Sequence, residues 1–197
     1  GVSVIRLFPD MDNLQRPLFL PHHIKHADLY FADDSIRFTD PYFGPIIELL
    51  LMHYLAQERG IILHACGIVI TDKGILFVGK SGAGKSTLAR LWDQENGADI
   101  LSDDRIIVRK QGREFRAYGT PWHGEAAFGS PREARLERIF FLSHGHKNFT
   151  KEITGLDPVA RLLTCSFPPL WDPKAMEFSL EFFSQIADHV PFHELSF

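Results

Sequence analysis

One segment, residues 79–86 with the sequence Gly-Lys-Ser-Gly-Ala-Gly-Lys-Ser, constrains the fold of this chain more than any other feature. It matches the phosphate-loop pattern GxxxxGK[ST] and lies between an apolar run at 75–78 and a helical run at 88–93, which is the context that gives the pattern its meaning. The glycines let backbone N–H groups converge on phosphate oxygens, and the start of the helix adds the positive end of its dipole. The pattern predicts a strand, a phosphate-binding loop and a helix that together hold a nucleoside triphosphate, rather than a glycine-rich turn without a ligand.

The side chains of this loop have separate electrostatic tasks. Lys85 places a positive charge on the β- and γ-phosphates, and the hydroxyl of Ser86 can ligate Mg²⁺. ATP and Mg²⁺ are therefore the expected cofactors. The residues predicted to bind the nucleotide are Gly79, Ser81, Gly82, Ala83, Gly84, Lys85, Ser86 and Thr87.

Two further groups lie at suggestive positions around the loop. Asp103 and Asp104 end an apolar strand at 99–102, and adjacent carboxylates on an extended segment point to opposite sides, so that one can face the nucleotide while the other braces the loop. His64 lies on a strand that the turn at 71–74 folds back against the strand before the loop, which brings its imidazole beside the phosphates as a metal ligand or proton carrier. The alternatives are a solvated Asp-Asp turn and a buried core histidine.

These elements taken together are recognisable. The segments Leu-His-Ala-Cys-Gly at 63–67, the loop at 79–86 and Ser-Asp-Asp-Arg at 102–105 resemble the catalytic core of the HPr kinase/phosphorylase family over residues 60–125. The resemblance implies an α/β fold in which a mixed sheet with flanking helices carries a P-loop, as in phosphoenolpyruvate carboxykinase. It also implies an ATP- and Mg²⁺-dependent kinase that phosphorylates a serine hydroxyl on a small protein or peptide.

The resemblance assigns roles to individual side chains. It implies that Asp103 is the base that orients or deprotonates the seryl hydroxyl, with His64 and Lys85 as the other catalytic residues. Ser86 and Asp104 would hold the metal, and Glu125 is a candidate second carboxylate for it because Mg²⁺ prefers carboxylate oxygens. An exposed loop position without a ligand is the alternative for Glu125.

The chain also departs from the full-length bacterial members of that family. It is too short for their separate N-terminal domain, and their glycine-rich signature after the aspartates, which is associated with removal of phosphate, is replaced by Tyr-Gly-Thr-Pro-Trp-His-Gly-Glu at 118–125. This segment is similar to shorter HPr-kinase-like proteins, including those that phosphorylate a serine on a ribosomally made peptide. Phosphorylase activity is accordingly not expected. Related enzymes assemble as hexamers, which leaves a homo-oligomer open.

Strands alternate with helices along the chain, and the hairpins around the loop favour a mixed rather than a parallel sheet. We expect one domain over 1–197, with an N-terminal elaboration (1–59), a nucleotide-binding core (60–125) and C-terminal helices and a strand (126–197). Asp157 and Pro158 are the expected N-cap and first residue of a helix. The other expected elements are a hairpin at 28–39, a helix at 45–59, strands at 61–64, 67–70, 75–78, 99–102 and 138–142, a hairpin over 106–118 and a helix at 174–189.

Composition excludes several classes of protein. Of the 197 residues, 45% are hydrophobic and 23% are charged, the formal net charge is −4, and no basic block suggests a nucleic-acid partner. The longest apolar run, 45–56, is interrupted by Glu48 and His53 and is too short to span a membrane. Cys66 and Cys165 fit no metal or redox spacing, which favours a reducing, cytoplasmic location. His22, His23 and His26 are expected in a surface segment rather than a metal site.

Two other functions remain open at this point. The loop by itself indicates binding, so a regulatory module that binds ATP without transferring its phosphate is one alternative. The other is a small-metabolite kinase or carboxykinase-like enzyme on the same scaffold. The sequence does not name the phosphate acceptor, because specificity depends on the shape of a groove that no motif describes.

Overall fold

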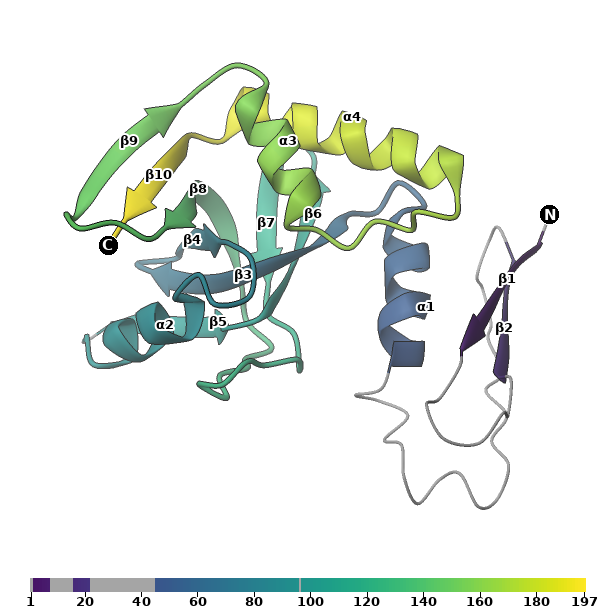
Figure 1. Cartoon of the computed structure of the whole chain (residues 1–197), viewed down its shortest axis with the longest axis horizontal. Helices are drawn as coiled ribbons and strands as arrows, with labels where there is room; N and C mark the ends of the chain where they lie inside the picture. Colours follow the sequence, from purple (N-terminus) through teal and green to yellow (C-terminus); the bar gives the residue numbers. More distant parts are fainter. Residues whose placement is uncertain (1, 8–15, 22–44, 96) are drawn as a thin grey trace.

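The central feature of the computed structural model is a mixed eight-stranded sheet (Figure 1). The structure describes residues 2–7, 16–21, 45–95 and 97–197. The sheet order is β4-β3-β6-β7-β8-β10-β9; β5 also pairs with β3, and a further β4–β8 pairing joins the first five strands into a ring. Its strands are β3 (Ile61–Ile70), β4 (Lys73–Val78), β5 (Ala98–Ser102), β6 (Arg105–Gln111), β7 (Glu114–Tyr118), β8 (Glu133–Ser143), β9 (Phe149–Ile153) and β10 (Phe192–Ser196).

The hairpin formed by β3 and β4 carries the phosphate loop. Its connection has two residues, Thr71 and Asp72, with φ of 49° and 61°. A two-residue loop with positive φ at both positions matches the right-handed twist of the paired strands. The two short strands predicted at 61–64 and 67–70 are one continuous strand, which is buried along most of its length because both faces of the sheet are covered.

Three strands run parallel and end at the same edge of the sheet. β8 pairs in parallel with β4 on one side and with β10 on the other, whereas the other pairings of the sheet are antiparallel. The register places Val78 opposite Phe141 and Ser196 opposite Ser143, so the chain leaves all three strands close together. The predicted mixed α/β sheet with a phosphate loop after an apolar strand is confirmed.

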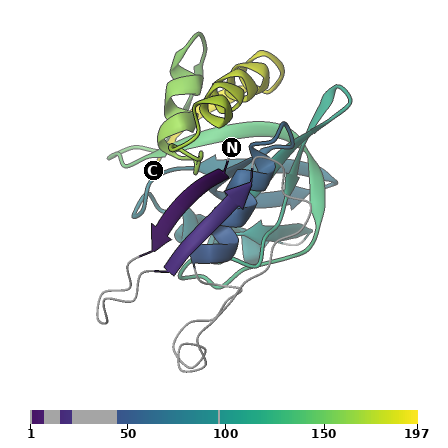
Figure 2. The ribbon, with the colours of Figure 1, turned by 90° about the vertical axis from the view of Figure 1, so that its right-hand side faces the viewer.

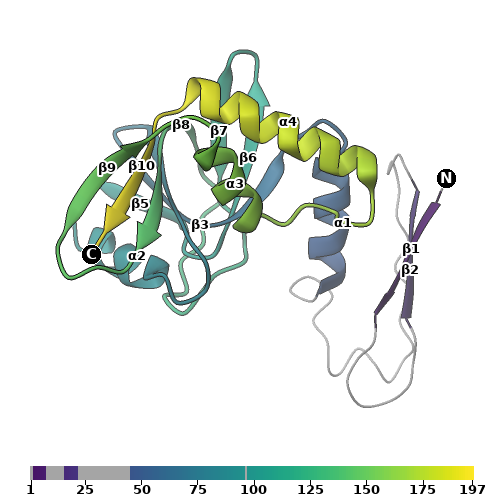
Figure 3. The same ribbon diagram turned by 45° about the horizontal axis from the view of Figure 1, so that its top comes forward.

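Alternate side chains of β3 enter two apolar cores. Leu63, Ala65 and Val69 face a large core that includes helices α3 (Asp157–Thr164) and α4 (Pro173–His189), which lie together on one side of the sheet (Figure 3). Cys66 and Ile68 face a smaller core against helix α2 (Lys85–Asp93). The helix that follows the phosphate loop is therefore fixed to the sheet by its own apolar contacts.

The C-terminal third differs from the prediction in several places. The strand predicted at 138–142 is part of the longer β8, which begins at Glu133, and two further strands, β9 and β10, follow it. The short, mostly exposed β9 has no apolar pattern from which it could be predicted. Helix α3 is capped by Leu156, so that Asp157 is its first residue and not its N-cap. Asp172 caps α4 instead, accepting the backbone N–H groups of Lys174 and Ala175.

The N-terminal part contains a two-stranded antiparallel hairpin, β1 (Val2–Leu7) and β2 (Arg16–Pro21), beside helix α1 (Pro45–Leu55) (Figure 2). Helix α1 ends at Leu55, and residues 56–59 form a turn rather than the last helical turn predicted there. The predicted hairpin at 28–39 and the cluster of His22, His23 and His26 lie outside the described residues. Within the described ranges, no helix is both long and apolar enough to cross a membrane.

Candidate functional site: a phosphate loop beside an imidazole and two carboxylates

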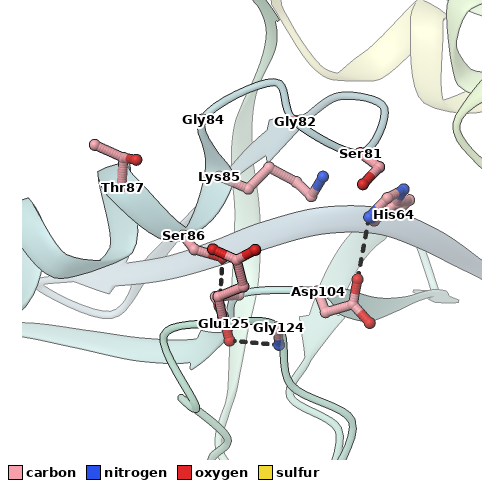
Figure 4. A pocket seen from close by; sticks show the side chains of 11 residues that line it. His64, Ser81, Gly82, Gly84, Lys85, Ser86, Thr87, Asp104, Gly124 and Glu125 are labelled. Carbon is pink, nitrogen blue, oxygen red and sulfur yellow. Dashed lines mark hydrogen bonds and ion pairs between the residues drawn. The ribbon is translucent and has the colours of Figure 1, made fainter.

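A cavity of about 240 Å³ lies beside the phosphate loop, and most of the predicted site residues line it (Figure 4). Ser81 and His64 lie at one end of the cavity, and Thr87 lies at the other. The loop, β3, the end of β5 and the segment after β7 all contribute to its wall. The lining residues are His64, Ser81, Gly82, Gly84, Lys85, Ser86, Thr87, Asp103, Asp104, Gly124 and Glu125.

The loop has the conformation that anion binding requires. Gly84 is the N-cap of helix α2 and has φ of 95°, a left-handed conformation that favours glycine. No side chain caps this helix, which leaves its first backbone N–H groups available to an anion. The buried Lys85 donates hydrogen bonds from Nζ to the carbonyl oxygens of Gly79, at 2.9 Å, and Lys80, at 3.0 Å. Burial lowers the pKa of this ammonium, and the nearby carboxylates oppose that effect.

Asp103 joins the helix to the segment that closes the cavity. Its buried carboxylate accepts a hydrogen bond from Ser86 Oγ at 2.7 Å and three more from the backbone N–H groups of Gly124, Ala126 and Phe128 at 2.9, 2.9 and 3.3 Å. Burial favours the protonated acid, but these four hydrogen bonds outweigh it and hold the pKa of Asp103 below its usual value. Asp103 is therefore the carboxylate that braces the loop.

Residue 124 must be glycine for this arrangement. A Cβ atom there would lie 2.7 Å from Oδ2 of Asp103 and 3.1 Å from Oγ of Ser86, where no room exists. The close approach of the backbone lets its N–H reach Oδ1 of Asp103. The segment after β7 is thus held against the helix that carries the phosphate loop.

Asp104 points to the other side of the strand and meets His64. Nε2 of His64 lies 3.1 Å from Oδ1 of Asp104, and both side chains are about one-fifth exposed, at 22% and 18% (Figure 4). Burial acts to raise the pKa of Asp104, but the hydrogen bond from His64 and the charges of Arg105, His64 and Lys85 have the larger effect. The pKa of Asp104 therefore lies below its usual value. The aspartate is therefore ionised near neutral pH and can orient the imidazole.

The sequence analysis missed the residues that fix this pair from behind. Arg105 forms an ion pair with Oδ2 of Asp104, donates from Nε to Glu48 of helix α1 at 2.8 Å, and lies over the ring of Phe167, with its guanidinium carbon 4.9 Å from the ring centroid. Glu48 was visible as a charge inside an apolar run, but its partner is 57 residues away in the sequence. Phe167 carried no signal, since a single aromatic residue after a helix is ordinary core material.

The oxygen atoms around Ser86 suit a magnesium ion. A hydroxyl and a carboxylate lie 2.7 Å apart at the start of α2, and hard cations take such oxygen ligands while keeping several waters. Glu125 is an exposed residue that also lines the cavity, and its backbone carbonyl oxygen accepts a hydrogen bond from Arg90. Among the described residues, no three His, Cys, Asp or Glu side chains form a self-sufficient metal cluster. Phosphate oxygens would have to complete the coordination.

Two of the predicted nucleotide-binding residues stand apart from the cavity wall. Gly79 and Ala83 belong to the loop but do not line the cavity. In the segment after β7, Trp122 is buried, at 7% exposed, whereas His123 is exposed.

One comparison with known proteins matches the segment that contains the phosphate loop. A family model described as an AAA domain matches residues 75–136, from β4 through the phosphate loop, α2, β5, β6 and β7 into β8. No curated protein matches the chain significantly. A solved structure that matches is the Hpr(Ser) kinase/phosphatase from Coxiella burnetii, with 18% identity, coverage of 69% of this chain and 84% of that chain, and a TM-score of 0.38. The family match covers the phosphate loop and the strands and helix around it, and with the loop geometry it supports nucleotide binding at this loop.

Proposed function

We propose that this protein is an ATP- and Mg²⁺-dependent kinase that transfers the γ-phosphoryl group to a serine hydroxyl of a small protein or peptide. The observation that carries the proposal is the position of the His64–Asp104 pair, 3.1 Å apart, in the same cavity as the phosphate loop. A protein that only holds a nucleotide needs the loop, whereas transfer also needs a group that orients the acceptor. The resemblance of the sequence to HPr kinase/phosphorylase supports serine as that acceptor.

The contacts favour a different division of labour between the two aspartates from the one that the resemblance implies. The four hydrogen bonds that Asp103 accepts occupy both of its oxygens, and one of them comes from Ser86. A carboxylate held in this way is a poor proton acceptor, but its negative charge stabilises a metal ion bound beside it. We therefore place Asp103 with Ser86 on the metal side, and Asp104 on the acceptor side.

His64 is the proposed proton acceptor. When Nε2 donates to Asp104, the lone pair of Nδ1 is free to receive the hydroxyl proton, as in other nucleophile–base–carboxylate arrangements. In the transfer step the seryl oxygen forms a bond to the γ-phosphorus, the bond from that phosphorus to the β,γ-bridging oxygen breaks, and ADP leaves. The proton released from the hydroxyl passes to the imidazole, whose charge Asp104 stabilises.

The phosphate loop supplies positioning and charge neutralisation. Lys85 and the backbone N–H groups at the start of α2 bind the β- and γ-phosphates, and their positive charge stabilises the departing diphosphate. Ser86, with Asp103 and Glu125 beside it, would hold Mg²⁺, which would supply positive charge to neutralise the phosphates. The chain contributes geometry in this scheme, since phosphoryl transfer needs little covalent help from the protein.

The decisive experiment is transfer of labelled phosphate from ATP into candidate small proteins and peptides, with mapping of the modified residue. We expect Asp104→Asn and His64→Gln to lower the transfer rate by about 100-fold or more, the usual contribution of a positioned acid–base group, while ATP affinity changes little. Asp93→Asn and His146→Gln, at exposed positions outside the cavity lining, are the matched controls and should leave the rate unchanged.

Other outcomes identify the alternatives. If the wild-type protein binds ATP but labels no protein, peptide or small molecule, it is an ATP-binding module. If label enters a free metabolite without a protein acceptor, it is a small-metabolite kinase. Equal transfer rates in Asp104→Asn and the wild type would contradict the assignment of the acceptor side.

A further inference from the structure

The nucleotide must extend from the loop in one direction only, and the site itself indicates which. The reacting phosphate has to lie beside the His64–Asp104 pair, at the end of the cavity where Ser81 lies (Figure 4). The α-phosphate and nucleoside therefore leave toward the opposite end, past Gly84 and Thr87. No residue considered so far accounts for the binding of the base.

The topology places two other chain segments at that edge. The phosphate loop follows β4, and the parallel strands β8 and β10 end beside it at Ser143 and Ser196. Ligands of α/β sheets bind in the space outside the carboxyl ends of parallel strands. The first residues beyond those two strands, His144 and Phe197, are both aromatic.

Both side chains contact the phosphate loop directly. Nε2 of His144 lies 3.0 Å from the carbonyl oxygen of Gly82. The ring of Phe197 touches the loop at Gly84, where an added Cβ would lie only 2.5 Å from Cζ of the ring. The two rings are tilted by 55° with their centroids 6.5 Å apart. An imidazole and a phenyl ring thus flank the loop from the ends of β8 and β10, outside the residues that line the cavity, and the phenyl ring lies at Gly84, past which the nucleoside leaves.

The backbone holds these aromatic groups in place. The N–H of Phe197 donates to the carbonyl oxygen of Ser143, and the N–H of Gly145 donates to the carbonyl oxygen of Phe197. His144 is exposed, whereas the ring of Phe197 is partly buried against the core beneath α2. Preorganised aromatic surfaces bind bases without a cost for ordering them, and they tolerate different bases because every base has a π-face.

We propose that His144 and Phe197 form the nucleobase subsite of this protein, with the base stacked on one or both rings and the triphosphate on the loop. The subsite rests on the nucleotide binding in the proposed function and adds the part of the ligand that the loop cannot recognise. It predicts that the protein distinguishes ATP from inorganic tripolyphosphate, which has the same phosphate chain and no base.

The test compares the Kd of ATP and of tripolyphosphate, each with Mg²⁺, by calorimetry on three proteins. For the wild type we expect ATP to bind tighter by roughly 5- to 100-fold, the range for one stacked base. Phe197→Leu, which keeps an apolar side chain but removes the aromatic face, should lose most of that ratio through weaker ATP binding, with tripolyphosphate affinity within about 2-fold of wild type. Phe178→Leu in α4, a partly buried aromatic residue of the other core, is the matched control and should keep the ratio.

A second measurement on the wild type remains informative if Phe197→Leu fails to fold. Photo-crosslinking with 8-azido-ATP should label peptides that contain His144 or Phe197. Equal wild-type affinity for ATP and tripolyphosphate, or crosslinks confined to other segments, would overturn the subsite while leaving phosphate binding intact. Failure of both ligands to bind the wild type would instead contradict nucleotide binding itself, and the proposed function with it.

Discussion

The hydrogen bonds around Asp103 make a quantitative prediction about stability. In Asp103→Asn the amide oxygen can replace only one of the two carboxylate oxygens. If it takes the place of Oδ1 it keeps the N–H groups of Gly124 and Phe128, but the new NH₂ group then faces the N–H of Ala126, which loses its acceptor. The hydroxyl of Ser86 can rotate to accept a hydrogen bond from the new NH₂ group, so it keeps a partner.

One backbone N–H that loses its acceptor costs about 1–3 kcal/mol, and the two bonds that remain weaken because the acceptor has lost its charge. We therefore expect Asp103→Asn to lower the free energy of unfolding by about 2 kcal/mol. Asp103→Ala, which removes the acceptor for three backbone N–H groups, should cost more, by about 3 kcal/mol or above. For a chain of this size 1 kcal/mol corresponds to roughly 2–4 °C in Tm, so the Asn variant should melt about 4–8 °C below the wild type.

Urea unfolding followed by circular dichroism measures these differences directly. Asp93→Asn is the control, because this aspartate is an exposed residue at the end of α2. An Asn variant as stable as the wild type would refute the reasoning, since it would mean that the segment after β7 does not depend on the carboxylate of Asp103. A loss of stability shared equally by the Asp93 control would refute it too.

Two further predictions concern titration and reactivity. Because the pKa values of Asp103 and Asp104 are lower in the folded protein than in the unfolded chain, the unfolded chain takes up protons first as the pH falls. The free energy of unfolding should therefore decline below about pH 4 and recover above it. Acid titration of urea unfolding should give a smaller decline for Asp103→Asn, and an equal decline would contradict the shift. Burial, with the nearby charge of Asp103, raises the pKa of the Cys66 thiol to about 12. Ellman's reagent at pH 8 should therefore leave this thiol unmodified in the folded protein and modify it in denaturant. Rapid modification of Cys66 in the native protein would contradict its burial.

Sequence and structure contributed different parts of the site. The loop at 79–86 could be recognised because its function requires glycines, a lysine and a hydroxyl at fixed spacing within one continuous segment. His64, Asp103 and Asp104 could be proposed as partners because each lies on a strand, or directly after one, that is one turn or one helix away from the loop. The N-cap of α3 and the strand β9 could not be located, because capping depends on one residue and a short exposed strand shows no period.

The roles of the two aspartates could not be read from the chain. Adjacent carboxylates on a strand must diverge, and the sequence determined that much. Which of them receives the backbone N–H groups of Gly124, Ala126 and Phe128 depends on how the segment after β7 folds back, and only the tertiary structure decided it. The same holds for the Glu48–Arg105 ion pair behind Asp104, whose two halves come from α1 and β6.

The sequence by itself determined the chemistry of the phosphate loop, because local backbone conformation and the spacing of side chains within a few residues are encoded where they act. The tertiary structure alone decided what surrounds the loop: the His64–Asp104 contact between β3 and the bend after β5, the hydrogen bonds of Asp103, and the meeting of His144 and Phe197 at the ends of parallel strands. Those contacts join residues far apart in the chain, and their geometry follows from sheet register and packing, which no local pattern specifies.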